Sequence, residues 1–355
     1  MAGALRPGSS LTVSAPDERR VLVVGAGAVG SRLVRQLVSD PEVGPVLLSD
    51  RRPGLASQVA RAVGDGVEPV AGANGLGTAG MGDMAGMAVV ALAVAAGDHR
   101  DLAVSALEAG ADVVSVADSI DDVRGLLDLD SEAVVRNRRV IVGAGYGPGL
   151  TCLLARHAAG WFDEVEEIHV AKSGTGGPDC ARQHHRALGG NAIDWRDGVL
   201  VDRNGRSGRE LVWFPEPVGA LDCYRGALAD SLLLVPEFPG VRRVTSRISA
   251  TRRDRLTALL PMMRRPHRDG GPGGVKVEMR GVRGSAREAV VLGAVDNPAT
   301  AAATVASVAV SRILSGGWDL AGSHGLAATA DATPWLAELA RRGVKAAVFE
   351  GAGSF

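Results

Sequence analysis

VLVVGAGAVGSRLVRQ, residues 21–36, is the stretch of sequence that decides the fold. Its first four residues are apolar, as expected of a strand buried on both faces in a parallel sheet. The next six residues contain the glycine spacing G-x-G-x-x-G, and apolar residues then recur at helical spacing. The stretch therefore predicts a strand, a tight turn and a helix, the unit that binds the pyrophosphate of a dinucleotide.

Each glycine of this turn has a separate expected role. Gly25 makes the tight turn, Gly27 lets the backbone approach a pyrophosphate, and Gly30 lets the helix pack closely on the strand. The first N–H groups of the helix have no partner within the helix, and they favour the binding of phosphate. We therefore expect the cofactor to contact the whole turn: Gly25, Ala26, Gly27, Ala28, Val29 and Gly30.

The residues after the second predicted strand bear on the choice of cofactor. This strand, expected over 46–49, ends in Asp50, which lies 20 residues past Gly30 (50 − 30), the usual distance for the acid that binds the adenosine ribose. A carboxylate here favours NAD, whereas Arg51 and Arg52 are suited to accept the 2′-phosphate of NADP or to stack on adenine. The sequence predicts NAD or NADP, with NAD slightly favoured. Further along the chain, the small residues Ala95 and Ala96 follow another strand and are expected to approach the cofactor.

The order of the predicted elements indicates two kinds of sheet. Strands and helices alternate as far as residue 142, with one long helix expected over 121–136, and this predicts a doubly wound parallel sheet of the Rossmann type. From residue 162 onward, strands follow one another with few helices between them, which predicts an α+β domain with a largely antiparallel sheet. The expected divisions are a disordered leader (1–18), a dinucleotide-binding domain (19–148), a substrate and dimerisation domain (149–296), and C-terminal helices that return to the first domain (297–355).

Composition restricts the classes of partner. The formal net charge of −1 argues against a nucleic-acid partner. The longest apolar run, 84–96, is too short to span a bilayer, and no secretory signal is evident at the N-terminus. The three cysteines show no paired spacing, which fits a reducing compartment. The sequence predicts a cytoplasmic protein with a small-molecule substrate and no membrane partner.

Several motifs, taken in order, resemble the saccharopine dehydrogenase-like oxidoreductases, and among them the lysine dehydrogenase arrangement. The matching pieces cover nearly the whole chain from residue 20: VLVVGAGAVGSRLVRQL (21–37), VVSVADSIDDV (113–123), VIVGAGYGPGLTCLLA (140–155), HVAKSGTGGP (169–178), LGAVDNPATAAATVASVAVSRILSGG (292–317) and PWLAELARRGVK (334–345). The resemblance implies hydride transfer between NAD(P) and a C–N centre of an amino acid or polyamine precursor, and, by analogy, a homodimer. The chain departs from the family pattern at 182–198 and in the arginine-rich segment 242–268, so the substrate does not carry over.

Oxidising an amine needs a base for its proton, and four residues are candidates for proton transfer. His184 and His185 are the first choice, because imidazole titrates near neutral pH and the resemblance places them near the cleft. Adjacent side chains on a helix diverge, so only one of the two is expected to point inward. Asp118 and Tyr146 follow strands at the ligand end of the sheet, where either would relay a proton or bind the amino group. A helix cap for Asp118 and a packed aromatic for Tyr146 are the alternatives.

A carboxylate anchor is expected nearby. Arg182 or Arg186, on a helix predicted over 182–188, would bind a carboxylate bidentately. The turn with Pro148 and Gly149 is the other candidate, because Pro148 is expected in the first turn of a helix whose free N–H groups attract anions. Cys180 and His184 have a spacing compatible with a metal, but no further ligands cluster there, so no metal is predicted.

The predicted function is an NAD(P)-dependent dehydrogenase or reductase acting on the CH–NH or CH–NH₂ group of a small amino-acid-like substrate. Two alternatives remain open. One is a catalytically silent NAD(P)-binding sensor or scaffold, and the other is a synthase that keeps NAD tightly bound.

Overall fold

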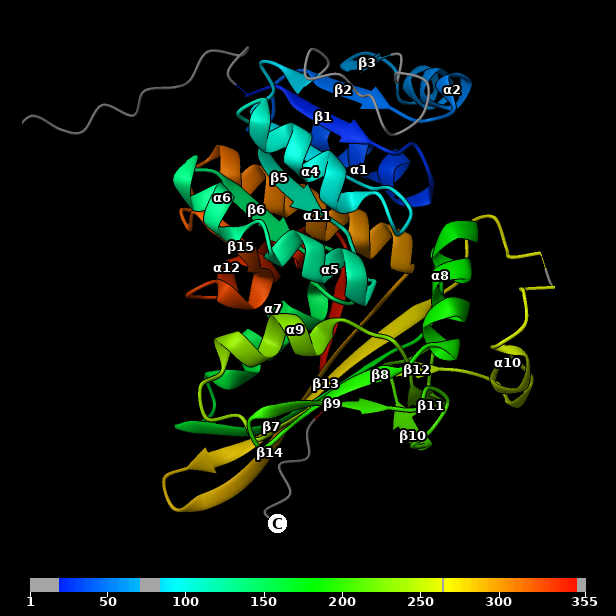
Figure 1. Cartoon of the computed structure of the whole chain (residues 1–355), viewed down its shortest axis with the longest axis vertical. Coiled ribbons are helices and arrows are strands. Elements are labelled where there is room, and N and C mark those ends of the chain that lie inside the picture. Colours follow the sequence, from blue (N-terminus) through cyan, green and yellow to red (C-terminus); the bar gives the residue numbers. More distant parts are fainter. Residues whose placement is uncertain (1–18, 71–83, 264, 350–355) are drawn as a thin grey trace, which may run out of the picture.

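The computed structural model describes residues 19–70, 84–263 and 265–349, and it contains two sheets, one above the other in Figure 1. The predicted leader, 1–18, lies outside the described residues. The upper sheet is parallel and the lower sheet is mixed, which confirms the predicted fold class.

The upper sheet contains seven strands, and all of its pairings are parallel among the described residues. Its central strands are almost completely buried, as the continuous apolar runs predict. The edge strand formed by residues 322–325 is not evident from the sequence, because Gly-Ser-His-Gly has neither the apolar character nor the alternation of a strand. In spatial order the strands are β15 (Gly322–Gly325), β6 (Arg139–Val142), β5 (Asp112–Ser115), β4 (Val89–Leu92), β1 (Val21–Val24), β2 (Val46–Ser49) and β3 (Val67–Pro69).

Helices cover both faces of this sheet (Figure 1). One prediction is corrected here, because the helix expected over 121–136 is two helices. The first ends at Leu127 and the second begins at Asp130, and the junction turns Leu129 into the core, where it is 2% exposed. The helices of this unit are α1 (Ala28–Val38), α2 (Pro53–Val63), α4 (His99–Glu108), α5 (Ile120–Leu127) and α6 (Asp130–Val135).

The lower sheet contains nine strands, and only the β7–β12 pairing is parallel among those described. The sequence did not indicate β11, whose polar residues interrupt its apolar ones. In spatial order the strands are β10 (Glu210–Trp213), β11 (Ala220–Arg225), β12 (Arg243–Ser249), β7 (Glu164–Lys172), β13 (Gly273–Arg283), β14 (Ala286–Asp296) and β16 (Lys345–Phe349), with β8 (Ala192–Arg196) paired to β12 and to β9 (Val199–Arg203).

The remaining helices are α7 (Leu150–Ala159), α8 (Pro178–Gly189), α9 (Asp230–Leu234), α10 (Arg252–Thr257), α11 (Pro298–Leu314) and α12 (Thr333–Arg341), with short 3₁₀ turns η2 (Val235–Glu237) and η3 (Leu326–Ala328). Of these helices, α7, α11 and α12 lie between strands of different sheets, and α8, α9 and α10 lie between strands of the lower sheet.

The C-terminal part of the chain, 297–355, contributes to both sheets. Helix α11 is rich in Ala and Val and packs against α1, β4 and β5 of the first sheet, as expected. The last described strand, β16, instead pairs with β14 of the second sheet, so this range does not return to the first unit as a whole. Helix α11 is apolar because it is buried in the core, and no described helix is long and apolar enough to cross a membrane.

Candidate active site

The turn between β1 and α1 has the geometry that its glycines predict. Gly25 adopts a φ of +105°, and a Cβ atom there would lie 2.4 Å from the carbonyl oxygen of Ala93. A Cβ at Gly30 would lie 1.7 Å from the Gly25 oxygen, so α1 can approach the turn only with glycine at this position. A Cβ at Gly27 would meet no atom within 4 Å. The backbone at Gly27, which caps α1, therefore borders open space large enough to admit a ligand.

Asp50 lies at the end of β2, beside this turn. Its carboxylate accepts hydrogen bonds from the backbone N–H of Ala26 (2.8 Å), from the backbone N–H of Arg52 (2.8 Å) and from the Arg52 guanidinium (3.1 Å). Burial opposes the ionisation of Asp50, but these hydrogen bonds outweigh it and hold its pKa below the usual value. Asp50 is thus a fixed anion, and Arg52 is already engaged with it. Arg51 is exposed.

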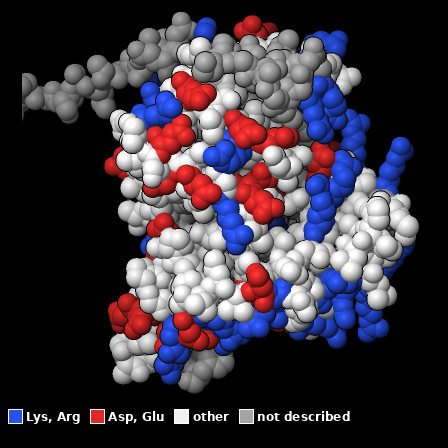
Figure 2. All heavy atoms as spheres, viewed as in Figure 1, with Lys and Arg blue, Asp and Glu red and all other residues white. Residues whose placement is uncertain are grey.

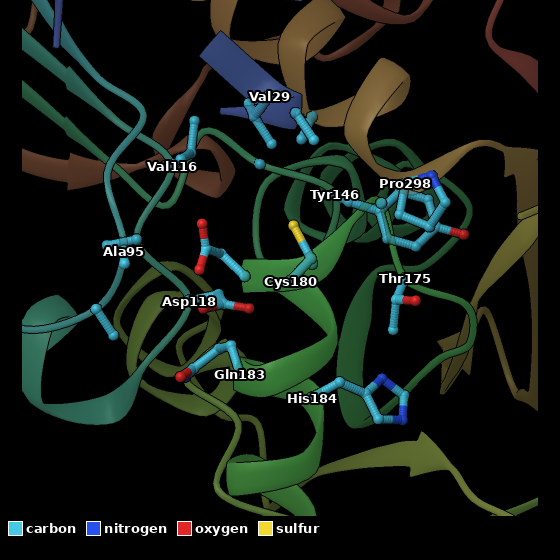
Figure 3. Close-up of a pocket in the computed structure, with 18 of the residues that line it drawn as sticks. Val29, Ala95, Val116, Asp118, Tyr146, Thr175, Cys180, Gln183, His184 and Pro298 are labelled. Atoms are coloured by element: carbon cyan, nitrogen blue, oxygen red, sulfur yellow. The ribbon is translucent and has the colours of Figure 1, made fainter. Parts of the chain in front are cut away.

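A cavity lies at the carboxyl edge of the parallel sheet, between the sheet and α8 (Figure 3). Ligands of doubly wound sheets bind at this edge. The open turn of α1 (Gly27, Ala28 and Val29) forms one side, and the residues after β4, β5 and β6 form the floor. Residues of β7, α8 and the start of α11 close the other side. The cavity therefore joins the turn predicted to bind a dinucleotide to the second unit of the chain.

Ala95 and Ala96 border this cavity. Their loop is fastened to α5, because both carboxylate oxygens of Asp122 accept the backbone N–H of Gly97 at 3.0 Å. Ser119 caps α5 through the Asp122 N–H. These contacts hold the two alanines at the cavity wall.

Lys172 and Asp118 meet in the cavity. The Lys172 ammonium lies 3.4 Å from the Asp118 carboxylate and donates a 2.6 Å hydrogen bond to the Gly147 carbonyl oxygen. Lys172 is largely buried, whereas Asp118 is 38% exposed and faces the open space. The sequence predicts a role for Asp118 and none for Lys172. Its rarity was the available signal, since the chain has only three lysines, Lys172, Lys276 and Lys345.

Tyr146 borders the same cavity and is 8% exposed. Its hydroxyl oxygen has no hydrogen-bond partner among the described residues. Burial, aided by the negative charge of Asp296, raises the pKa of the phenol well above its usual value. Tyr146 is therefore a protonated phenol whose hydroxyl oxygen is itself buried.

The geometry argues against both histidines as the general base. His184 borders the cavity, but its Nε2 lies 2.8 Å from the Ser249 carbonyl oxygen, which can only accept a proton. Burial lowers the pKa of His184 to about 4, so the imidazole is a weak base. In Figure 3 its ring lies on the opposite side of α8 from Asp118. His185 does not border the cavity, and its Nε2 lies 2.8 Å from the Leu260 carbonyl oxygen.

The lowered pKa of His184 predicts a pH-dependent stability. Between its ordinary pKa of 6.5 and the folded value of about 4, the unfolded chain binds more protons than the folded protein. The contribution of His184 is fully present above pH 6.5 and is lost as the pH falls toward 4. The His184→Gln variant should therefore show a smaller drop in the free energy of unfolding between pH 7 and pH 5 than the wild type, measured by urea titration. His185→Gln is the matched control, and an equal drop in all three proteins would contradict the assignment.

The predicted carboxylate anchors separate into those that face the cavity and those that do not. Arg186 and Pro148 border it. Arg182 does not, and it pairs with Asp179 on the same helix, which begins at Pro178 and not at residue 182.

The turn before α7 does not present its first N–H group to an anion. Pro148 precedes the helix, which begins at Leu150, and the Leu150 N–H already donates to the Gly145 oxygen at 3.0 Å. Gly149 is turned inward, since a Cβ there would lie 2.4 Å from the backbone of Gly145. Neither Arg182 nor Gly149 borders the cavity, so the structure gives no support to their predicted roles as anchors.

Three further residues face the cavity without a signal in the sequence. Gln183 points toward Asp118 from α8, and the Cys180 side chain also points into the space (Figure 3). Burial raises the pKa of the Cys180 thiol to about 11, so it stays neutral. His99 is 2% exposed, and its Nδ1 lies 2.8 Å from the Ser115 hydroxyl oxygen. Burial lowers the pKa of His99 as well. A sequence does not show that such residues share one cavity, because only the tertiary structure brings them together.

Charge is unevenly distributed around the cavity. In Figure 2, acidic side chains gather over α4, α5 and α6, whereas basic side chains line the edge formed by α8 and the region of α10. Arg186 belongs to this basic edge and also borders the cavity. A basic edge beside a cavity raises the local concentration of anionic ligands.

Comparison with solved structures places the fold. No family model matches the chain. Saccharopine dehydrogenase (L-Glu forming) from Saccharomyces cerevisiae superposes with a TM-score of 0.69 and 14% sequence identity. The match covers 93% of this chain and 100% of the yeast chain. Homospermidine synthase from Legionella pneumophila, solved in complex with NAD, has a TM-score of 0.67 and 12% sequence identity. The match covers 94% of this chain and 92% of the Legionella chain. The DAP dehydrogenase of C. glutamicum, solved in complex with DAP, has a TM-score of 0.51 and 17% sequence identity. The match covers 92% of this chain and 99% of the DAP dehydrogenase chain.

These likenesses agree with the resemblance found in the sequence motifs. They extend over both sheets of the chain, because the matches cover more than nine-tenths of it. The chain therefore has the saccharopine dehydrogenase-like fold.

Proposed function

We propose that this protein is an NAD(P)-dependent oxidoreductase that acts on a C–N bond of a small amino-acid-like substrate. The observation that carries the proposal is the Lys172–Asp118 pair, which faces a cavity continuous with the open turn at Gly27. A charged acid–base pair beside a dinucleotide turn is what amine oxidation or imine reduction requires.

The residues of the turn fit a dinucleotide. The first turn of α1 has no side-chain cap, and the α-carbon of Gly27 borders open space, so backbone N–H groups are available to a pyrophosphate. Asp50 is placed to bind the adenosine ribose, and Ala95 and Ala96 leave room along the cavity wall. When bound, the nicotinamide supplies the hydride-transfer chemistry.

The polar residues of the cavity then have distinct roles. Asp118 binds the substrate ammonium through an ion pair. When the amine is oxidised, Lys172 in its neutral amine form, beside the same carboxylate, takes up the released proton and becomes an ammonium. When the imine is reduced, that ammonium returns the proton. Arg186, which borders the cavity, pairs with the carboxylate of the substrate.

The first experiment measures cofactor reduction with amino acids and diamines, and the reverse reaction with 2-oxo acids plus an amine. We expect turnover with substrates that carry both an amino group and a carboxylate. NAD or NADP at millimolar concentration should also raise the melting temperature, since a ligand that binds only the folded state stabilises it. If neither cofactor changes the melting temperature, the proposal fails.

Two other outcomes define the alternatives. A protein that binds NAD but turns over no amine is the silent sensor or scaffold. Purified protein that carries stoichiometric NAD and forms product without net NADH is the synthase.

The Asp50 contacts predict a preference for NAD. Because Asp50 is an ionised carboxylate and Arg52 is already paired with it, a 2′-phosphate would meet repulsion there. We expect Asp50→Asn to weaken NAD binding by about tenfold or more, the loss of one charged hydrogen bond. NADP binding should weaken less or improve, as measured by calorimetry. Asp65→Asn, at an exposed position after α2, is the control. Equal losses for both cofactors would contradict the assignment.

A further inference from the structure

One edge of the lower sheet carries exposed apolar side chains. Strand β12 pairs with β7 along one side, so β8 and β11 share its other side, and β9 and β10 follow them there as the outermost strands. Among the strand side chains that the structure describes, the large apolar ones that are exposed all lie on these two outermost strands: Val199, Leu200, Leu211 and Trp213. Exposed apolar surface is therefore concentrated where the sheet has no further strand.

Strand β10 has the sequence of a strand that is covered on both faces. Residues 211–214, Leu-Val-Trp-Phe, form a continuous apolar run. The chain itself covers one face only. Val212 and Phe214 are each 2% exposed and pack with Cys223, whereas Leu211 is 58% exposed and Trp213 is 62% exposed. The sequence of β10 thus fits a strand whose second face is covered by another molecule.

The backbone of β10 has unpaired groups at the same edge. The Phe214 N–H donates a 3.0 Å hydrogen bond to the Gly219 carbonyl oxygen, which continues the ladder between β10 and β11. Residues of an antiparallel pair alternate between bonding to the partner strand and pointing away from it, so Val212 bonds to β11. The N–H and C=O groups of Leu211 and Trp213 therefore point to the free edge. Lysine and proline commonly protect such edges, and β10 contains neither.

We propose that β10 pairs in an antiparallel manner with β10 of a second copy of this chain, about a two-fold axis at Val212. In this register Leu211 lies opposite Trp213 of the second copy, and symmetry forms the same pair again. The outward N–H and C=O groups of both residues gain partners, and each exposed leucine is covered by an indole ring. This pairing does not depend on the proposed function.

The charges beside β10 permit a symmetric contact. Glu210 lies 3.1 Å from the Arg247 guanidinium, and Arg209 lies 2.9 Å from the Asp222 carboxylate. The charges next to the apolar residues are therefore neutralised within each copy, and the two-fold pairing does not oppose unpaired like charges. A strand that pairs with itself also supplies both halves of the contact from one sequence, which favours a second copy over an unrelated partner.

The first experiment measures the mass of the protein in solution by sedimentation at several protein concentrations. We expect the wild type to approach the mass of two chains as the concentration rises, because one short strand pair is small beside the roughly 1,600 Å² of a standard interface. Leu211→Lys places a charge on the edge and should weaken self-association by about tenfold or more. Because Leu211 is exposed in the single chain, the melting temperature at low concentration should stay near that of the wild type.

Leu256→Lys is the matched control. Leu256 on α10 is 79% exposed, so this variant also exchanges an exposed leucine for lysine, but away from the free edge. Its self-association should equal that of the wild type. A wild type that stays monomeric at every concentration would overturn the proposal and leave the edge to a different partner. Dissociation by Leu256→Lys and not by Leu211→Lys would overturn it as well.

Hydrogen exchange tests the pairing without a substitution. In the wild type, exchange of the Leu211 and Trp213 amides, followed by NMR, should slow as the protein concentration rises. The Val212 amide bonds to β11 in one copy or two, so its exchange is the internal control. Equal exchange of the Leu211 and Trp213 amides at all concentrations would contradict the pairing.

A pair of cysteines tests the register. Hydrogen-bonded residues of an antiparallel pair have Cα atoms about 5.5 Å apart, within the range that a disulfide spans. The double variant Leu211→Cys/Trp213→Cys should therefore form disulfides between two copies on mild oxidation. Each single variant controls for the three cysteines of the chain and should not cross-link. Cross-linking by Leu211→Cys alone, or none in the double variant, would show that the proposed register is wrong.

Discussion

Replacing Lys172 with methionine is expected to lower kcat by about 10²–10⁴-fold, the contribution of one positioned acid–base group. Methionine keeps the length and apolar character of the stem, but it removes the ammonium that contacts Asp118 and the Gly147 carbonyl. Cofactor binding should change little, because Lys172 lies across the cavity from the turn at Gly27.

The control for this substitution is Lys276→Met. Lys276 is similarly shielded and pairs with Glu278 at 3.0 Å, but it does not border the cavity. Both variants remove one ammonium from a partly buried ion pair, so a general loss of stability would affect them alike. Steady-state rates together with NAD binding by calorimetry separate the outcomes. A Lys172→Met enzyme with wild-type kcat would remove Lys172 from the mechanism.

A pair of alanine substitutions in the first turn should separate folding from cofactor binding. In Gly30→Ala, the new methyl group would lie 1.7 Å from the Gly25 oxygen, and that oxygen belongs to the backbone. The turn must deform, so we expect a loss of about 3 kcal/mol or more in the free energy of unfolding. Gly27→Ala meets no atom within 4 Å and has a φ of −71°, so its stability should stay within about 0.5 kcal/mol of wild type.

Gly27→Ala should nevertheless lose cofactor affinity by about tenfold or more, because the methyl group occupies the space through which a pyrophosphate reaches the helix N-terminus. Urea unfolding and calorimetric titration with NAD test the two effects separately. A Gly27→Ala protein that binds NAD as the wild type does would show that the open space at this turn is not the phosphate site.

The sequence was most informative where function depends on local backbone geometry. The roles of Gly25 and Gly30 follow from close approaches within the β1–α1 unit, and these involve residues near in sequence or on the adjacent strand. Helices α2 and α11 also begin with a proline, which is a local start signal that the sequence itself carries.

It was least informative where function depends on residues far apart. Lys172 meets Asp118 although 54 residues separate them. His184 and His185 are candidates because of the chemistry of imidazole, but burial lowers the pKa of His184, and the Nε2 atom of each ring lies beside a backbone carbonyl oxygen. A sequence shows which side chains are able to transfer protons, and it does not show their solvation or their partners.

The amino-acid sequence by itself determined the two kinds of sheet, the glycine turn and the acid at the end of β2, because each follows from periodicity or from a fixed local spacing. Only the tertiary structure decided which charged groups face the cavity. The pairing of Lys172 with Asp118 arises because the end of β7 lies beside the loop that follows β5, at the edge of a sheet that other segments build.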